Sequence, residues 1–215
     1  METMTTSIIL PFLVFFPFLG AVISYIIGRS NKGARDIWCW ILSAVIFIAS
    51  LMLIGKETVY SLRGFCGLGL SFVADGFGVI LAVLTGAIWL ITTIFSKEYM
   101  AAERNRNRYY FFVFLTLGAT MGIFLSADLF TTFIFFEIMS FTSFVLVMHD
   151  EEDFTVRSAK TYLAVAVIGG LVTLMGLFMM YQKAGTLNMT ELTAFMQSRE
   201  NPAEFYAIGV LILFG

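Results

Sequence analysis

The chain has 215 residues, of which 59% are hydrophobic and only 13% charged, and its formal net charge is −2. A water-soluble domain of this length could not bury so much apolar surface, because too little of its volume is interior. The composition therefore excludes a soluble globular protein, and the sequence has no basic field of the kind that binds nucleic acid.

A transmembrane helix needs about 20 predominantly apolar residues. Six stretches meet this requirement: Thr6–Ile27, Ile37–Ile54, Gly76–Phe95, Tyr109–Leu125, Leu129–Met148 and Thr161–Tyr181. A seventh apolar run begins near Phe205 and continues to Gly215, after a helix-start pattern with Asn201 as N-cap and Pro202 in the first turn. We therefore expect an all-α, polytopic transmembrane protein, a single domain over residues 1–215 with six full spans and the start of a seventh. We interpret the chain as the N-terminal part of a longer protein.

The distribution of positive charge predicts the orientation in the membrane. Nine of the 13 Lys and Arg residues fall in the first, third and fifth connections between the predicted spans. Lys and Arg near the ends of short loops stay cytoplasmic, so the N-terminus is expected outside. The two cysteines, Cys39 and Cys66, then lie near opposite faces of the membrane, and no disulfide between them is expected.

The remaining loops carry limited information. Residues 55–75 are rich in Gly between short β-branched and aromatic runs, and they predict an external hairpin-like loop. Residues 182–202 predict a second external loop with a short surface helix, capped by Thr190. The acidic run "HDEEDF" is interpreted as a solvated turn in which Asp153 caps the next helix, in preference to an ion-collecting mouth.

The composition also restricts redox and nucleotide chemistry. A bis-imidazole haem needs two histidines, and a cysteine-ligated iron–sulfur cluster needs four cysteines, whereas the chain has one His and two Cys. A phosphate-cradling Gly-rich loop is also missing from the sequence. We therefore expect no cofactor site, no metal site and no catalytic residue here. Electron transfer linked to this protein would take place in another subunit.

One acid interrupts the fifth predicted span. Glu137 lies near its middle, although a charge at that depth costs roughly 2.5–3.5 kcal/mol on insertion scales. On a helix, an aromatic face that includes Phe133 and Phe141 surrounds it, with Ser140 close by as a supporting group, and Thr131 and its polar neighbours collect on the opposite side. A proton-exchanging group is the favoured interpretation. The alternative is a neutral, hydrogen-bonded carboxyl that pins two helices together.

Lys160 is the second ionisable candidate, because it immediately precedes the apolar run of the sixth span. By position alone, an extended side chain that reaches the interface is the simpler explanation. The helix that follows offers small residues, Ala166, Gly170 and Thr173, for close packing.

Several segments carry a resemblance to a known family. The sequence "ADLFTTFIFFEIMSFTSFVLV", the sequence "RSAKTYLAVAVIGGLVTLMGLFMMYQKAGTLNM" and the upstream "LGLSFVADGFGVILAVLTGAIWLITTIFSKEYM" resemble the antiporter-like subunits shared by respiratory complex I, Mrp-type cation/proton antiporters and energy-converting membrane hydrogenases. The resemblance implies a fourteen-helix fold with inverted repeats, of which this chain would be the N-terminal half. It also implies that Glu137 matches the family's fifth-helix glutamate and that Lys160 matches a sixth-helix lysine. The family's seventh-helix lysine would follow shortly after Gly215.

The resulting functional hypothesis is a proton-translocating antiporter-like subunit that moves protons through Glu137 and Lys160, with Ser140 in support. It would be embedded in the bilayer of a prokaryotic plasma membrane, beside other membrane subunits of a redox-coupled or antiport complex, with sodium as an alternative ion. A structural subunit that transports nothing is the first alternative. A stand-alone channel or unrelated transporter is the second, although it would need ionisable groups or carbonyl-lined breaks in several spans.

Overall fold

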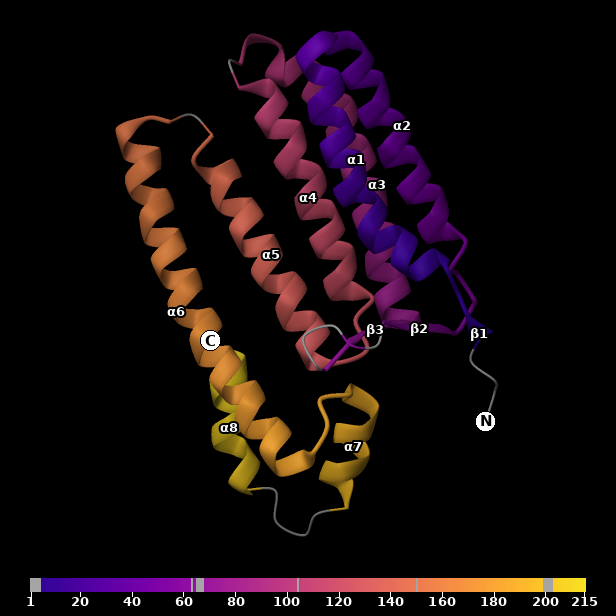
Figure 1. Ribbon diagram of the computed structural model, residues 1–215, viewed down its shortest axis with the longest axis vertical. Helices are drawn as coiled ribbons and strands as arrows, with labels where there is room; N and C mark the ends of the chain where they lie inside the picture. The colour runs from indigo at the N-terminus through magenta and orange to yellow at the C-terminus, as the bar shows by residue number, and fades with distance from the viewer. Residues whose placement is uncertain (1–4, 63, 65–67, 104, 150, 199–202) are drawn as a thin grey trace.

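The computed structural model describes residues 5–62, 64, 68–103, 105–149, 151–198 and 203–215, and the described chain is mainly helical (Figure 1). The chain begins with the two-residue strand β1 (Thr5–Thr6). Two long helices, two short strands and a third long helix follow: α1 (Ile9–Ser30), α2 (Lys32–Leu51), β2 (Thr58–Leu62), β3 (Leu70–Ala74) and α3 (Gly76–Tyr99). A short 3-10 turn, Met100–Ala102, leads to α4 (Arg106–Phe124), α5 (Leu129–Val147), α6 (Asp153–Ala184), α7 (Met189–Gln197) and α8 (Ala203–Phe214).

Five of the described helices, α1, α2, α3, α5 and α6, are long and apolar enough to cross a membrane. The prediction of a polytopic helical membrane protein is thus confirmed. The predicted fourth span corresponds to α4, which has 19 residues but begins with Arg106 and Arg108 and is less apolar than the other five. The total of six full spans therefore stays a prediction.

Local sequence signals explain where the helices begin and end. The side chain of Asn31 accepts hydrogen bonds from the first-turn amides of α2, Asp75 accepts one from Gly78 at the start of α3, and Asp128 accepts one from Thr131 at the start of α5. Each satisfies a backbone N–H that lacks a partner inside its helix. Helix α6 ends at Gly185, whose φ of 75° lies in the left-handed region that favours glycine.

Two predicted caps are wrong. Glu152, not Asp153, is the N-cap of α6, its side chain makes no cap hydrogen bond, and Asp153 lies in the first turn instead, where a negative charge is favourable. Asn188, not Thr190, caps α7, because its side-chain oxygen lies within 3.0 Å of the Thr190 amide. The predicted cap at Asn201 lies outside the described residues.

The main apolar core lies between α1, α2, α3 and α4, where α1 packs against both α2 and α4. Helices α1 and α4 approach closely at Gly118 of α4, where an added Cβ atom would lie 2.9 Å from the Val14 carbonyl oxygen of α1. Helix α5 packs against α4, and its Phe135 side chain is buried in the main core.

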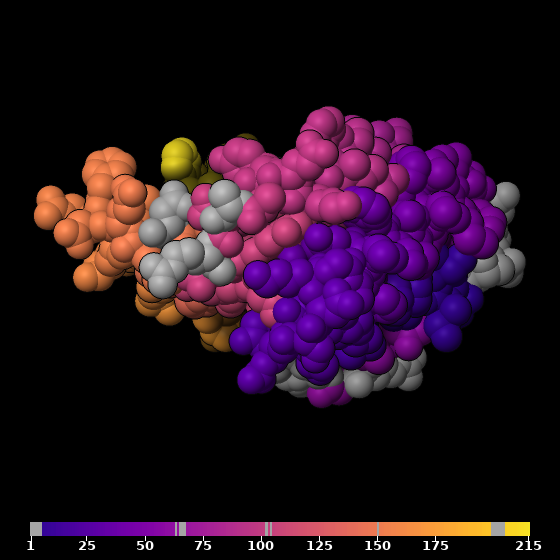
Figure 2. Space-filling view, turned by 90° about the horizontal axis from the view of Figure 1, so that it is seen from above, coloured from indigo at the N-terminus to yellow at the C-terminus, as the bar shows by residue number. Residues whose placement is uncertain are grey.

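Helix α6 lies at the outer edge of the molecule. It packs against α5 on one side and α8 on another, and a smaller apolar cluster, which includes Leu177, Leu192 and Ile208, joins α6, α7 and α8. Figure 2 shows the end of α6 (orange) projecting at one edge, apart from the larger mass of α1 to α4 (indigo to magenta).

We call the end of the bundle that contains β1, β2, β3 and residues 125–128 and 187–189 the hairpin end. Strand β2 pairs antiparallel with β3, from Thr58 opposite Ala74 to Leu62 opposite Leu70, and β1 adds a short parallel pair. Backbone hydrogen bonds continue from β3 to residues 125–127, and from residues 127–129 to residues 187–189. The opposite end, where the α1–α2, α3–α4 and α5–α6 connections gather, is called the basic end (Figure 1).

Candidate functional site

The candidate site is built on α5, one side of which is fixed to its neighbours by hydroxyl groups. At the hairpin end, the Thr131 hydroxyl accepts a hydrogen bond from the Ser71 amide of β3 at 3.0 Å and donates to its own cap, Asp128, at 2.7 Å. Near the other end, the hydroxyls of Thr116 and Thr142 lie 2.9 Å apart across the α4–α5 contact. The polar side of this helix, which the sequence predicts around Thr131, thus packs against β3 and α4 at these positions.

Glu137 lies on a different side of α5, toward α6. Its carboxyl group occupies the space above Gly170, where an added Cβ atom would lie 2.9 Å from Cδ and 3.0 Å from Oε2. The residue is partly buried. Gly170 thus provides the room for the carboxyl group, because any other residue at this position would meet it with a side chain.

Glu137 has no hydrogen-bond or ion-pair partner among the residues that the structure describes. Of the predicted aromatic neighbours of Glu137, Phe133 packs against the cluster of α6, α7 and α8, and Phe141 is half-exposed. A carboxyl group in this position can hold or release a proton, and the described residues around it supply no fixed counter-charge.

A cavity of about 370 Å³ lies between α5, α6 and α8; Glu137 is not among its lining residues. Phe136 and Thr173 line it, and so does Gly215 at the end of the chain. Gly215 also contacts α6, because an added Cβ atom there would lie 2.6 Å from the Gly169 carbonyl oxygen. The end of α8 therefore reaches the same turn of α6 that receives the Glu137 carboxyl group. In Figure 1 the C-terminus accordingly lies over α6.

The other two predicted residues lie apart from this contact. Ser140 is buried one turn further along α5, and its backbone carbonyl accepts a long hydrogen bond, 3.4 Å, from the Tyr162 hydroxyl of α6. Lys160 is exposed in the second turn of α6. Ten residues separate it from Gly170, which corresponds to about 15 Å along the helix axis. The structure does not bring Lys160 to Glu137.

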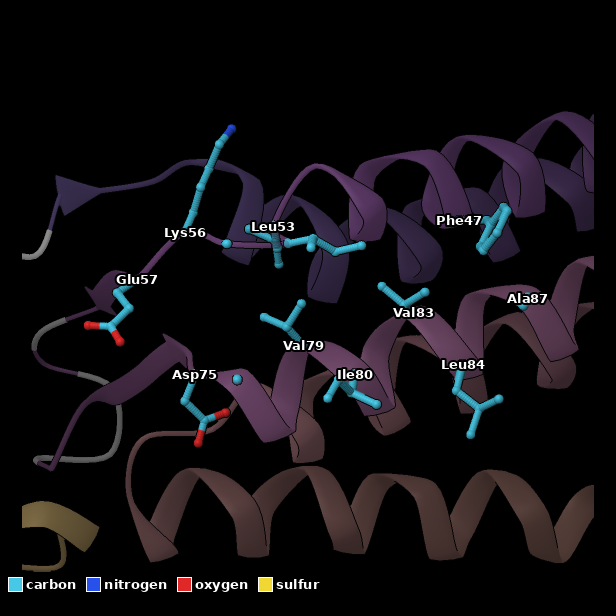
Figure 3. A pocket seen from close by; sticks show the side chains of 13 residues that line it. Phe47, Leu53, Lys56, Glu57, Asp75, Val79, Ile80, Val83, Leu84 and Ala87 are labelled. Carbon is cyan, nitrogen blue, oxygen red and sulfur yellow. The ribbon is translucent and has the colours of Figure 1, made fainter.

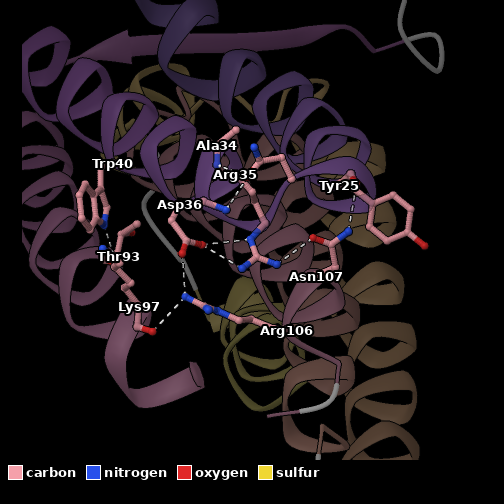
Figure 4. Close-up of polar contacts among 11 residues, drawn as sticks. Tyr25, Ala34, Arg35, Asp36, Trp40, Thr93, Lys97, Arg106 and Asn107 are labelled. Carbon is pink, nitrogen blue, oxygen red and sulfur yellow. Dashed lines mark hydrogen bonds and ion pairs between the residues drawn. The ribbon is translucent and has the colours of Figure 1, made fainter. Parts of the chain in front are cut away.

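A buried charge cluster at the basic end was not predicted from the sequence. Arg35 is 1% exposed, and its Nη2 donates to Asp36 Oδ1 at 2.9 Å, while Arg106 donates to Asp36 Oδ2 at 2.9 Å. Figure 4 shows the two guanidinium groups converging on this carboxylate, with Asn107 as a further acceptor for Arg35 at 3.0 Å. Both guanidinium groups also lie over the Tyr110 ring. The cluster joins α2 to α4.

The acidic run between α5 and α6 also pairs with α4. Glu151 receives hydrogen bonds from Arg108 and Asn105, and it has a φ of 56°, which is uncommon for a residue other than glycine. These contacts favour the predicted solvated turn over an ion-collecting mouth. Within the described ranges, no three His, Cys, Asp or Glu side chains gather as a metal-ligand set.

The second half of the chain matches a known protein family. Residues 126–215 match the family described as "NADH:quinone oxidoreductase/Mrp antiporter, TM". The matched range contains α5, α6, α7 and α8, and therefore the contact between Glu137 and Gly170.

Two curated relatives have similar sequences. The putative antiporter subunit mnhD2 of Staphylococcus epidermidis is 29% identical over 219 residues, which cover 98% of this chain and 43% of the relative. A Na(+)/H(+) antiporter subunit of Alkalihalophilus pseudofirmus is 28% identical over 145 residues, which cover 67% of this chain and 29% of the relative. The chain thus spans less than half the length of the relatives that it matches.

Two solved structures share the fold. A chain of the membrane-bound sulfane sulfur reductase, an archaeal respiratory membrane complex, superposes with a TM-score of 0.85 at 19% identity, over 97% of this chain and 44% of that chain. A chain of the Mrp complex from Dietzia sp. DQ12-45-1b superposes with a TM-score of 0.79 at 22% identity, over 95% of this chain and 39% of that chain.

Proposed function

We propose that this chain, which is similar to antiporter-like membrane subunits, forms the N-terminal part of a proton-translocating subunit in which Glu137 exchanges protons. The observation that carries the proposal is the position of this carboxyl group. It lies on a membrane-crossing helix, against Gly170 of a second one, without a counter-charge among the described residues. An acid at this depth is costly to insert, and such residues usually serve transport.

A change of partner would make Glu137 a proton carrier. A cation within about 4–6 Å favours the charged carboxylate, whereas its withdrawal into apolar surroundings favours the protonated acid. Each cycle of approach and withdrawal would release and take up one proton. From the family resemblance we expect a lysine shortly after Gly215. The end of α8 lies against Gly169 of α6, which is next to Gly170, the residue that contacts Glu137. A lysine there would be suited to this role.

Lys160 and Ser140 are the further members of the proposed path. Lys160 would exchange protons at the basic end, and water would have to bridge the distance of about 15 Å along α6 to the level of Glu137. Ser140, one turn from Glu137, would support that water. Protons are the proposed ion, with sodium as the alternative, and the proposed partners are other membrane subunits. The proposed location is a prokaryotic plasma membrane, with the N-terminus outside.

Replacement of Glu137 tests the proposal directly. In the full-length protein within its complex, Glu137→Gln keeps the shape of the side chain but removes the exchangeable proton. It should assemble normally and abolish coupled proton uptake by membrane vesicles. Glu137→Asp, which is one methylene shorter, should keep part of the uptake. Wild-type uptake by Glu137→Gln, at equal amounts of assembled protein, would contradict the proposal.

The same experiment separates the structural alternative. If the carboxyl group only pins α5 to α6, Glu137→Gln should transport normally, because an amide can make the same packing contact. Glu137→Leu should then be nearly silent as well.

A further inference from the structure

An apolar groove runs between α2 and α3 on the side of the bundle remote from α6. Its volume is about 740 Å³. Buried Val79 and partly buried Val83 lie at its base, and Ile80 and Leu84, which are 66% and 54% exposed, lie at its rim. Figure 3 shows Val79 and Val83 pointing from α3 toward Leu53 and the α2 side, whereas Ile80 and Leu84 point away from it.

Charged residues surround only one end of this groove, which we call its mouth. Lys56, Glu57 and Asp75 line the mouth, beside Gly76 at the start of α3. Figure 3 shows Lys56 extending from one edge of the mouth, with the carboxyl groups of Glu57 and Asp75 toward the other. An added Cβ atom at Gly76 would meet nothing within 4 Å, so the mouth is open there.

The length of the groove matches one leaflet of a bilayer. From Gly76 to Ala87, its lining covers eleven residue steps of α3, or about 16 Å. The hydrocarbon core of a bilayer is about 30 Å thick, so one leaflet contributes about 15 Å. With the charged mouth at the membrane interface, the apolar part of the groove ends near the bilayer centre.

The charged mouth favours a lipid over another transmembrane helix as the occupant. Lys56, Glu57 and Asp75 match the charges of a zwitterionic head group, whereas the lipid-facing surface of a transmembrane helix is apolar. Water is also a poor occupant, because apolar walls offer it no hydrogen bonds. Acyl chains are thin, flexible and apolar, and the bilayer supplies them at this surface.

We propose that this groove is a binding site for one phospholipid with an amine-bearing, zwitterionic head group, taken from the leaflet at the hairpin end. One of its two acyl chains lies along Val79, Val83 and Ala87. Its phosphate pairs with Lys56, and its ammonium group pairs with Glu57 and Asp75. A head group without the amine is disfavoured, because two carboxylates and one ammonium group leave the mouth with net negative charge.

Native mass spectrometry of the purified full-length protein tests the site. The probes are phosphatidylethanolamine and, separately, phosphatidylglycerol with the same acyl chains. The wild-type protein should retain one more phosphatidylethanolamine molecule than Gly76→Phe, in which the ring closes the mouth. Lys56→Glu should also lose this molecule. The matched control, Ile91→Phe on the same helix outside the groove, should behave as wild type. Equal retention by Gly76→Phe and the wild type contradicts the proposal.

A second measurement does not depend on a groove-filling substitution. A photo-crosslinking amino acid at Leu84, in cells that contain the complete complex, should form adducts with phosphatidylethanolamine. A polypeptide adduct at this position would identify a neighbouring subunit as the occupant and overturn the lipid site. Neither experiment measures proton transport, so the outcome is independent of the role of Glu137.

Discussion

The carboxyl group of Glu137 on α5 lies over the backbone of Gly170 on α6, so closely that an added Cβ atom would approach its Cδ to 2.9 Å. The contact pairs a costly intramembrane acid with a residue that has no side chain. The position of the carboxyl group is therefore determined by a residue on the neighbouring helix.

Substitution of Gly170 by alanine should alter transport more than stability. The added methyl group meets the far end of a flexible side chain, which can rotate away, so Gly170→Ala should fold and assemble. The displaced carboxyl group should then lower proton uptake in vesicles. The double variant Gly170→Ala/Glu137→Asp should show less than the sum of the two losses, because the shorter acid relieves the contact. Strictly additive losses would contradict this coupling.

A glycine that faces rigid backbone should behave differently. Gly118→Ala places a methyl group 2.9 Å from the Val14 carbonyl oxygen and closer still to the Phe18 ring. The carbonyl belongs to the rigid backbone of α1 and the Phe18 ring packs against the core, so the unfolding free energy should fall by about 1–3 kcal/mol. Gly209→Ala on α8, where an added Cβ atom meets nothing within 4 Å, is the control and should not lower it. Thermal unfolding of the full-length protein in detergent measures both.

Lys160 can be tested with a substitution that keeps its charge. An arginine at this position still reaches the interface, but its guanidinium group cannot release a proton in proteins. If Lys160 belongs to the path, Lys160→Arg and Lys160→Ala should both lower proton uptake while assembly stays normal. Lys32→Arg, at the exposed start of α2, is the matched control. Normal uptake by Lys160→Arg would leave the lysine with an interfacial role only.

The buried cluster of Arg35, Asp36 and Arg106 should be a determinant of stability. Removal of the central carboxylate by Asp36→Asn leaves two guanidinium groups without their counter-charge, which should cost about 3–5 kcal/mol of unfolding free energy. Asp153→Asn removes an exposed carboxylate and should change stability by less than about 1 kcal/mol. Similar melting temperatures for the two variants would show that the cluster contributes little.

The orientation is testable at Asn105, which is exposed at the start of α4. The proposed topology places it on the cytoplasmic side. Asn105→Cys, in a protein whose native cysteines are replaced by serine, should be protected from impermeant thiol reagents in intact cells and labelled after permeabilisation. Labelling in intact cells would reverse the topology.

Hydropathy predicted the helices well where apolar sequence and helix coincide. The fifth span was predicted as Leu129–Met148 and the helix runs from Leu129 to Val147. The sixth was predicted as Thr161–Tyr181, but α6 begins eight residues earlier, at Asp153. Hydropathy reports which residues suit lipid, whereas the helix continues into water because its backbone hydrogen bonds do not require apolar side chains.

The sequence identified Glu137 as the candidate residue but did not predict which residue of α6 it contacts. Glu137 is conspicuous because it is an acid in an apolar run, and Gly170 was expected only to favour close packing. Which residue of α6 faces the carboxyl group depends on how α5 and α6 are rotated about their axes and shifted along them. The sequence of α6 does not indicate this, because its polar and apolar residues are not separated onto distinct faces. Arg35 and Asp36 were assigned to a loop, because polar residues beside an apolar run usually mark its end. Their adjacent opposite charges were the available signal for a buried pair.

The backbone hydrogen bonds that join the segments at the hairpin end affect how far the amino-acid sequence there can change. From β1 through β3 to residues 125–129 and 187–189, the contacts are made by backbone amides and carbonyls, which every residue except proline provides in full. Amino-acid replacements along these segments therefore leave most of the bonds available, provided that the backbone stays extended. The basic end depends instead on three particular side chains. Homologous chains should accordingly vary more freely in the first region, apart from the helix caps Asp128 and Asn188, and change in the second only by coordinated replacement.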